Sequence, residues 1–186
     1  MTLRRLWVRT AVLAAVVLVG TLVGCGRFFP AHTAEDMARS REQVRAMAAE
    51  DLAALAEALG GTLVSGYGEY HSGGDGMVNK WQYSVRLRVE GPAPTVGQMV
   101  EAFEALGYKI VKTYDGSSEG GLGVSAERDG LSVIGSIFDS RYSLSVHGPY
   151  LTLPMEEGVP PSEKETVDVP GYGTLPLPRY GTPPSD

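Results

Sequence analysis

The sequence predicts an α+β fold in which helices cover one face of a largely antiparallel sheet. Two segments carry apolar residues at helical spacing, and each ends at a glycine. The segments that follow them alternate apolar and polar residues, or form short apolar runs bounded by glycine-rich turns. Such an order of helices and strands is typical of two layers, because each helix must bury its apolar stripe against the sheet.

A long helix is expected from Ala34 to Leu59. Thr33 opens a capping-box pattern with Asp36 in its third place. Gly60-Gly61 supplies the stop. The apolar stripe of this helix comprises Met37, Val44, Ala48, Leu52, Leu55 and Leu59.

The clearest strand signal lies in VNKWQYSVRLRVE, after a strand expected at 62–70 and a turn at HSGGDG. Its alternation predicts one buried and one solvent-facing side. The apolar positions are Trp81, Tyr83, Val85, Leu87 and Val89. The polar positions are Lys80, Gln82, Ser84, Arg86 and Arg88.

A second, shorter helix is expected after Thr95, which starts a capping box with Gln98. Its stripe holds Met99, Val100, Phe103 and Leu106, and Gly107 ends it. Four strands should follow, at 108–114, 121–128, 131–138 and 142–147. Asp129-Gly130 is typical of a two-residue hairpin turn between the second and third of them.

An internal repeat suggests a duplicated helix–strand–strand unit. EALGGTLVSGY at 57–67 aligns with EALGYKIVKTY at 104–114, with six identical residues in eleven and an offset of 47. A second glycine cluster recurs at the same offset. The alternative is that helix–glycine–strand junctions favour similar residues without common descent.

The C-terminal part, 154–186, holds eight of the twelve prolines, together with many acids, glycines, serines and threonines. Such a composition offers little apolar surface to offset the entropy of ordering. This tail is expected to be largely disordered or extended, and the folded body is expected to span 33–153.

The N-terminus has the organisation of an export signal. Arg4, Arg5 and Arg9 precede an uncharged apolar run from Ala11 to Gly24. That run has 14 residues, and a membrane-spanning helix needs about 20. The arginine pair also resembles a twin-arginine signal, but Leu3 stands where that signal has Ser or Thr. An ordinary basic signal therefore remains the alternative.

Leu22, Val23, Gly24 and Cys25 resemble the bacterial lipobox. This resemblance implies that the thiol of Cys25 is alkylated with diacylglycerol and that a signal peptidase cuts after Gly24. The signal peptide would then be 1–24 and the lipidated tether 25–32. A free cysteine near an ordinary signal peptide is the alternative. Two acyl chains suffice for a stable anchor.

Charge and cysteine content limit the classes of partner. Removing the signal peptide takes away three arginines and no acid, so the formal charge falls from −6 to −9. An acidic protein is not expected to bind nucleic acid or to associate with anionic headgroups through its net charge. Since Cys25 is the only cysteine, the mature protein is expected to have no disulfide.

Motifs for catalysis, cofactors or metals do not emerge. His32, His71 and His147 are not at metal-ligand spacing. Glu69, His71 and Asp75 surround one turn that could hold a cation, but a solvated turn fits them better. No nucleophile elbow, phosphate-binding loop or zinc-protease motif occurs. Aromatic residues could form a sugar-stacking platform or belong to the core: Tyr67, Tyr70, Trp81, Tyr83, Tyr108 and Tyr114.

The chain as a whole resembles small actinobacterial lipoproteins of unknown function, the LppA-like kind. The resemblance rests on the lipobox, the α+β body, the last strand running into HGPYL and the Pro-rich end. The order of elements also resembles the BON type of envelope domain, which is implicated in phospholipid binding. Long glycine-rich turns and added strands depart from the BON pattern. The LppA-like kind brings no catalytic residues to carry over.

These observations together predict an extracytoplasmic lipoprotein at the outer face of the cytoplasmic membrane, acting as a non-catalytic binding or accessory module without a cofactor or a metal. An envelope protein, a lipid or a wall polymer would be its partner. An enzyme with a site assembled from distant residues and a passive spacer remain the alternatives. The candidate ligand face is the polar side of the best strand, with Lys80, Gln82, Arg86 and Arg88, and Ser143, Ser145 and His147 could extend it. An ordinary solvated face is the alternative to a functional one.

Overall fold

The computed structural model describes residues 31–73, 79–116, 121–138, 141–154 and 160–178. They fall almost entirely in a compact unit that begins at His32. The expected signal peptide, the lipobox with Cys25 and Asp75 in the HSGGDG turn lie outside the described residues. None of the described helices is long and apolar enough to cross a membrane.

The predicted long helix is confirmed. It is built from α2 (Ala34–Met47), the π-helical turn η1 (Ala48–Leu52) and α3 (Ala53–Ala58). The predicted capping box is present, since Thr33 Oγ1 accepts from the Asp36 amide at 3.2 Å and Asp36 Oδ2 accepts from the Thr33 amide at 2.9 Å. All six expected stripe residues, from Met37 to Leu59, are buried.

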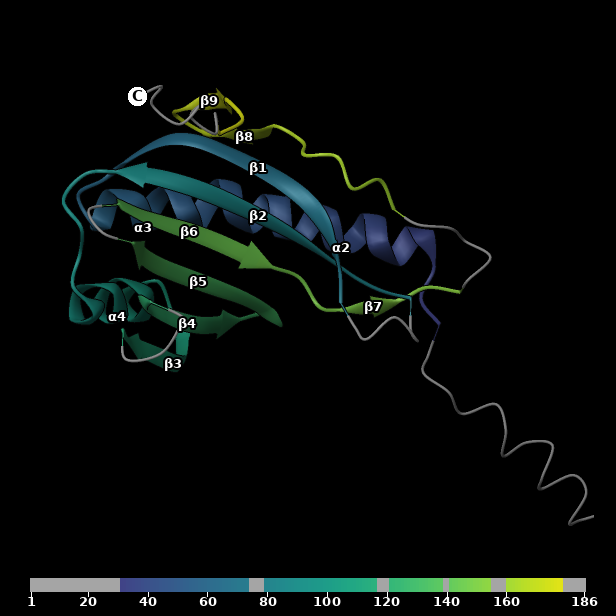
Figure 1. Ribbon diagram of the computed structural model, residues 1–186, viewed down its shortest axis with the longest axis horizontal. Coiled ribbons are helices and arrows are strands. Elements are labelled where there is room, and N and C mark those ends of the chain that lie inside the picture. Colours follow the sequence, from purple (N-terminus) through teal and green to yellow (C-terminus); the bar gives the residue numbers. More distant parts are fainter. Residues whose placement is uncertain (1–30, 74–78, 117–120, 139–140, 155–159, 179–186) are drawn as a thin grey trace, which may run out of the picture. The chain divides into compact units, whose positions relative to one another are not determined.

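Seven strands form one antiparallel sheet (Figure 1). The order across it is β1-β2-β6-β5-β4-β3, and β7 also pairs with β2. The strands are β1 (Thr62–Ser72), β2 (Lys80–Glu90), β3 (Lys109–Asp115), β4 (Leu122–Arg128), β5 (Leu131–Phe138), β6 (Arg141–His147) and β7 (Leu151–Thr152). The α+β prediction is therefore confirmed. Strand β2 pairs with β6, which lies far from it in the sequence.

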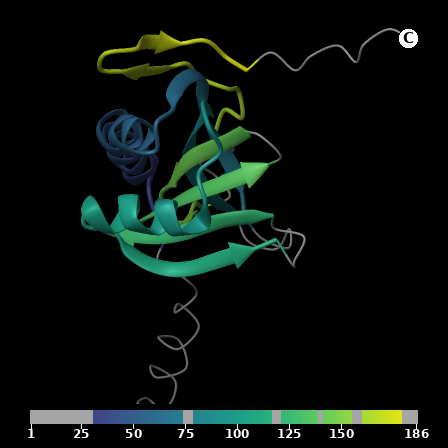
Figure 2. The same cartoon turned by 90° about the vertical axis from the view of Figure 1, so that its left-hand side faces the viewer.

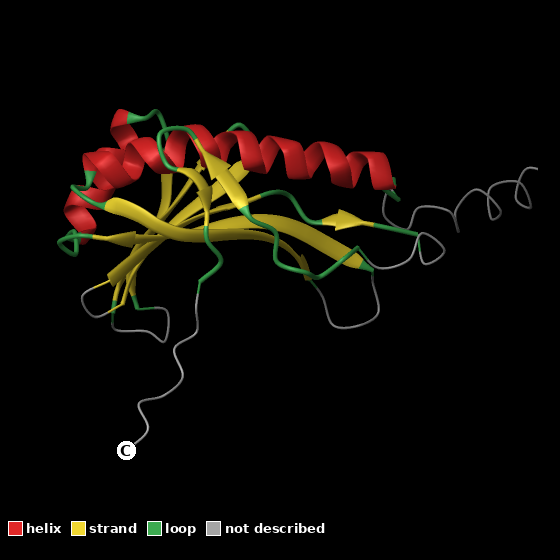
Figure 3. Ribbon diagram, turned by 90° about the horizontal axis from the view of Figure 1, so that it is seen from above, coloured by secondary structure: helices red, strands yellow, loops and turns green. Residues whose placement is uncertain are grey.

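Both helical segments lie on the same face of this sheet, and none of the described helices lies on the other, which we call the helix-free face (Figure 3). The second helix, α4, spans Val96–Ala105 and begins with the predicted Thr95–Gln98 capping box. The core between the layers combines the helix stripes with Tyr83, Val85, Leu87 and Val89 of β2. Burial at about 25 cal/mol per Å² of apolar surface makes this layer the main source of stability.

The predicted repeat has structural counterparts at the same offset of 47. Gly60 and Gly107 both adopt positive φ, at 71° and 81°. Each helix ends in an equivalent backbone hydrogen bond. In the first helix Gly61 N donates to Ala56 O at 2.8 Å, and in the second Tyr108 N donates to Phe103 O at 3.0 Å. The pairing register also shifts between Leu63 and Ser65 in β1 and between Ile110 and Lys112 in β3. These matches support a duplicated unit.

For residues 160–178 the expected disorder of the tail is wrong, whereas the expected extended conformation is present in two strands that pack on the folded body. These strands are β8 (Val167–Val169) and β9 (Gly173–Leu175), which pair with each other beside the outer edge of β1 (Figure 2). Val167, Val169 and Leu175 are at most 3% exposed and join the main core. A few well-placed apolar residues outweigh the Pro-rich composition, so the folded body extends beyond 153.

Candidate functional site

The helix-free face of the sheet carries the polar residues of β2 that the alternation predicted. Arg86 is exposed and Arg88 is half-buried, whereas Ser84, expected to face solvent, is buried. Arg86 lies opposite Ser145 of β6, and Arg88 lies opposite Ser143. The register therefore places the two arginines beside small hydroxyl side chains.

The predicted ligand face divides into two ends. Lys80 and Gln82 lie toward β7, where Lys80 pairs with Thr152 in the ladder. Gln82 donates a hydrogen bond to the carbonyl of Gly148 at 2.7 Å, so its amide has a structural partner. Arg86 and Arg88 occupy the other end. Lys80 and Gln82 therefore do not join them in one cluster.

A cavity of about 270 Å³ opens at the arginine end of this face. We call it the arginine pocket. Its lining comes from β1, β2, the end of β5, the start of β6 and the C-terminal segment. The lining residues are Ser65, Gly66, Tyr67, Arg86, Arg88, Phe138, Arg141, Tyr142, Ser143 and Pro178.

Small side chains open the arginine pocket. Arg88 lies between Ser65 of β1 and Ser143 of β6 in the ladder. Since neither serine reaches far above the sheet, both leave room for the cavity beside Arg88. Tyr67, Phe138 and Pro178 are larger and supply apolar surface around the same space.

Three arginines line this pocket, and no Asp or Glu is among the described residues that line it. No ion pair joins Arg86, Arg88 or Arg141 to another residue within the described ranges. Like charges around one cavity repel one another where none of the described lining residues offers a counter-charge. A bound anion would relieve that repulsion, and the guanidinium fork matches phosphate and carboxylate oxygens.

Arg141 lies one residue before the strand expected at 142–147, so the sequence did not predict it on this face. Arg141 has the same strand parity as Ser143 and Ser145, so extending the predicted β6 by one residue would have assigned it to this face. The pairing of β6 with β2 was not predictable from local pattern, because β3, β4 and β5 separate the two strands in the chain.

The C-terminal segment supplies one wall of the pocket. The carbonyl of Pro176 accepts a bond from the Gly66 amide at 3.0 Å, and Gly68 exchanges two backbone bonds with Glu165 at 2.8 and 2.9 Å. These bonds cover the outer edge of β1. They also bring Pro178, two residues further on, to the pocket rim.

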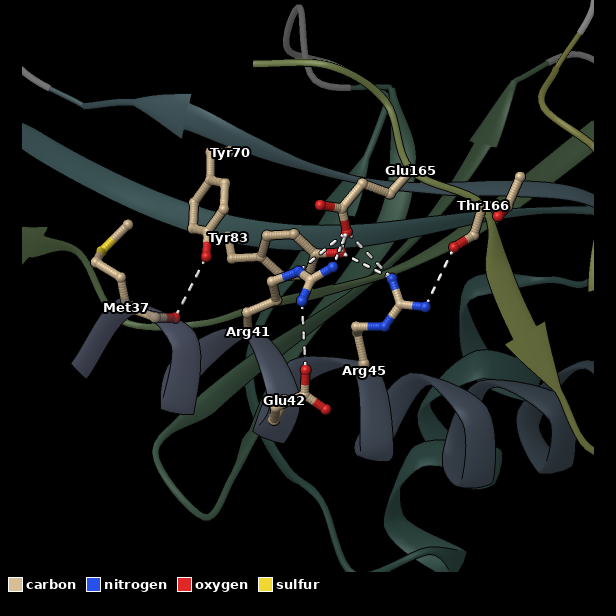
Figure 4. A network of polar contacts seen from close by, with 8 residues as sticks. All are labelled: Met37, Arg41, Glu42, Arg45, Tyr70, Tyr83, Glu165 and Thr166. Carbon is tan, nitrogen blue, oxygen red and sulfur yellow. Dashed lines mark hydrogen bonds and ion pairs between the residues drawn. The ribbon is translucent and has the colours of Figure 1, made fainter. Parts of the chain in front are cut away.

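A charged cluster holds the same segment to the long helix (Figure 4). Glu165 Oε2 accepts hydrogen bonds from Arg41 Nη2 at 2.7 Å, Arg45 Nη1 at 3.2 Å and the Tyr83 hydroxyl at 3.0 Å. The bond to Glu165 raises the pKa of Arg41, and burial raises the pKa of Tyr83. Since the carboxylate accepts hydrogen bonds from three side chains, it has the character of a structural anchor.

Two serine–histidine pairs lie on the helix-free face. His71 Nε2 is 2.6 Å from Ser84 Oγ, and Ser145 Oγ is 2.9 Å from His147 Nε2. Burial, with further effects of Arg86 and His71, lowers the pKa of His147 to about 4. Ser84 and Ser145 are only 4% and 6% exposed, so neither hydroxyl is accessible as a nucleophile. The pairs therefore satisfy buried polar groups.

A second buried cluster connects the two layers. Asp51, in the π-helical turn, accepts hydrogen bonds from the Tyr108 hydroxyl and from Arg128. Arg128 also donates to the carbonyl of Leu106 at 2.8 Å and lies over the Tyr108 ring. Burial and the bond to Asp51 raise the pKa of Tyr108. Every charged group here has a partner, which is typical of a structural cluster.

The aromatic residues do not form one sugar-stacking platform. Tyr83 and Tyr108 belong to the main core, Trp81 packs in a smaller cluster with Met37, and Tyr70 contacts Tyr83 edge-on at 4.9 Å. Tyr67 is on the helix-free face, where Lys164 Nζ lies 4.2 Å from its ring centre. Among the described residues there is also no cluster of His, Cys, Asp or Glu able to hold a metal ion.

Comparison of the chain with family models, curated proteins and solved structures found no match. We therefore infer function from the residues of the arginine pocket and from the chemistry they allow.

Proposed function

We propose that this protein is a membrane-anchored lipoprotein of the cell envelope whose domain binds an anionic ligand without transforming it. The observation that carries this proposal is that Arg86, Arg88 and Arg141 line one cavity with no carboxylate in its described lining. The lipobox at Cys25 supports the anchor, which would hold the domain at the outer face of the cytoplasmic membrane.

Binding fits the pocket better than catalysis does. General acid–base or nucleophilic chemistry needs an accessible group with a suitable pKa. The residues that line the pocket offer guanidiniums, tyrosines and serines. The histidine with the depressed pKa, His147, is not among them. An enzyme of the envelope and a passive spacer are the rival proposals, and the second would bind no ligand.

The test compares two charge-reversed variants of the full chain in non-ionic detergent. Arg86→Glu with Arg88→Glu alters the pocket. Lys109→Glu with Lys112→Glu makes the same change at two exposed positions of β3, outside the pocket. Pyrophosphate is titrated in metal-free buffer and followed by ligand-observed NMR.

The parent and the lysine variant are expected to bind pyrophosphate with similar affinity. The affinity of the arginine variant is expected to be at least about tenfold lower, because it lacks charge-assisted hydrogen bonds to the ligand. Binding should also weaken with salt. Equal loss in both variants would show that only general charge matters. Absence of binding to the parent would contradict the proposal and favour the spacer. Release of orthophosphate during the titration would favour the enzyme.

A further inference from the structure

The arginine pocket combines charge with apolar surface. Phe138 is 57% exposed at the end of β5, although an aromatic ring of this size gains free energy from burial. Tyr67 and Pro178 line the same space. A site that recognised only a charged group would need none of these three side chains.

The positions of the arginines are set by the ladder. Arg86 and Arg88 are two residues apart on β2, and Arg141 is two residues from Ser143, the partner of Arg88. Along the strand direction, each arginine is thus about 6.6 Å from the next. Phe138 is the ladder partner of Arg141. The apolar ring therefore lies beside the outermost charge of the row.

Ligand size follows from the volume. At about 30 Å³ of liquid volume per water-sized group, a ligand of about nine non-hydrogen atoms fits in the 270 Å³ cavity. A phosphate group accounts for five of them, and its oxygens suit several guanidinium forks better than the two oxygens of a carboxylate do. About four atoms remain for an apolar portion against Phe138.

We infer that the arginine pocket binds the phosphate monoester or diester of an alkyl group, with the phosphate on the arginines and the first carbons against Phe138, Tyr67 and Pro178. This inference rests on the proposed anion-binding function and names the ligand class. The same chemistry occurs in a soluble alkyl phosphate and in the headgroup region of a phosphatidic acid.

Two ligands of equal size distinguish the contribution of charge to binding from that of apolar contact. Pyrophosphate and butyl phosphate each have nine non-hydrogen atoms. Pyrophosphate carries more charge, and butyl phosphate carries four carbons. The full chain in non-ionic detergent is titrated with each of them by ligand-observed NMR. Butyl phosphate is expected to bind at least about fivefold more tightly, the size expected for four partly buried carbon groups.

A pair of matched variants tests the apolar wall. Phe138→Ser removes the exposed ring at the pocket, and Val111→Ser removes a side chain of similar exposure, 54%, on β3 outside it. Phe138→Ser should weaken the binding of butyl phosphate until its affinity is about that of pyrophosphate. The affinity for pyrophosphate should not change. Val111→Ser should change neither. Since both residues are exposed, both variants are expected to fold, and circular dichroism checks this.

A third variant tests the cavity without a change of charge. Ser143→Leu fills the space beside Arg88, and Ser132→Leu places the same side chain on the same face, outside the pocket lining. Only Ser143→Leu should abolish binding of butyl phosphate. Competition by phosphatidic acid in mixed micelles then identifies the source: displacement of butyl phosphate indicates a lipid headgroup, and no displacement indicates a soluble ligand.

The outcomes separate this inference from the proposed function. If pyrophosphate binds in an arginine-dependent way and at least as tightly as butyl phosphate, the inferred alkyl group of the ligand is wrong, and the proposed anion binding stands. Butyl phosphate affinity that is unchanged in Phe138→Ser would lead to the same conclusion. If neither ligand binds the parent, both the inference and the proposed function are wrong.

Discussion

Glu165 Oε2 accepts a hydrogen bond from Arg41 Nη2 at 2.7 Å, across 124 positions of the chain. The carboxylate belongs to the segment that covers β1, and the guanidinium belongs to the long helix. This pair therefore fixes the C-terminal segment against both layers, and with it the wall that Pro178 adds to the arginine pocket.

Glu165→Gln is expected to lower the free energy of unfolding by about 1–2 kcal/mol, because two partly buried arginines lose their counter-charge. For a chain of this size the midpoint of thermal unfolding should fall by roughly 3–8 °C. Glu163→Gln, an exposed position in the same segment, is the control and should not shift it. Equal midpoints for the two variants would mean that the contact contributes nothing to stability.

Leu175→Ala is expected to cost about 2–4 kcal/mol, since a buried leucine is replaced and a cavity is left. Leu175 is 3% exposed and belongs to the main core. Leu177→Ala, at a position that is 41% exposed, should cost less than about 0.5 kcal/mol. Urea unfolding of both variants measures the difference. Similar midpoints would restore the original expectation that this segment does not pack on the body.

Acid should destabilise the protein through His147. Its pKa is lowered to about 4 in the folded state and is about 6.5 in an unfolded chain. Between these values the unfolded state binds more protons, so stability is complete above about pH 6.5 and falls as the pH approaches 4. His147→Gln should remove on the order of 1–2 kcal/mol of this loss. Parallel pH profiles of stability in parent and variant would contradict the assignment.

Cys25→Ala is expected to prevent both lipidation and cleavage after Gly24, because no other cysteine thiol is present. Intact mass and detergent partitioning of protein from its native envelope would show the change. The parent should carry a diacylglycerol and the variant should keep its full N-terminus. A free, unmodified Cys25 thiol in the parent would overturn the anchoring proposal.

The helices and strands could be predicted from the sequence because their signals lie within short segments of the chain. The capping boxes at Thr33 and Thr95, the stop glycines and the alternation in β2 each depend on residues within a few positions of one another. The tail was misjudged for the opposite reason. Val167, Val169 and Leu175 are too few to make a local apolar pattern, yet each finds a place in a core built by distant segments.

The site was predicted in part for the same reason. Arg86 and Arg88 followed from strand parity, but their meeting with Arg141, Phe138 and Pro178 depends on which strands become neighbours. Lys80 and Gln82 share that parity and still lie at the other end of the face. Parity identifies a face of a strand, and only the order of strands shows where on that face a pocket opens.

The most direct measurement is a titration of the guanidinium NMR signals of the full chain with butyl phosphate. The Nε–Hε signals of Arg86, Arg88 and Arg141 should shift together with one dissociation constant, and those of Arg39, which pairs with Glu35 and Asp36 on the long helix, should remain in place. A saturable shift confined to the three pocket arginines is the result we expect. Unchanged pocket signals at saturating ligand, or equal shifts of all arginines, would contradict the account.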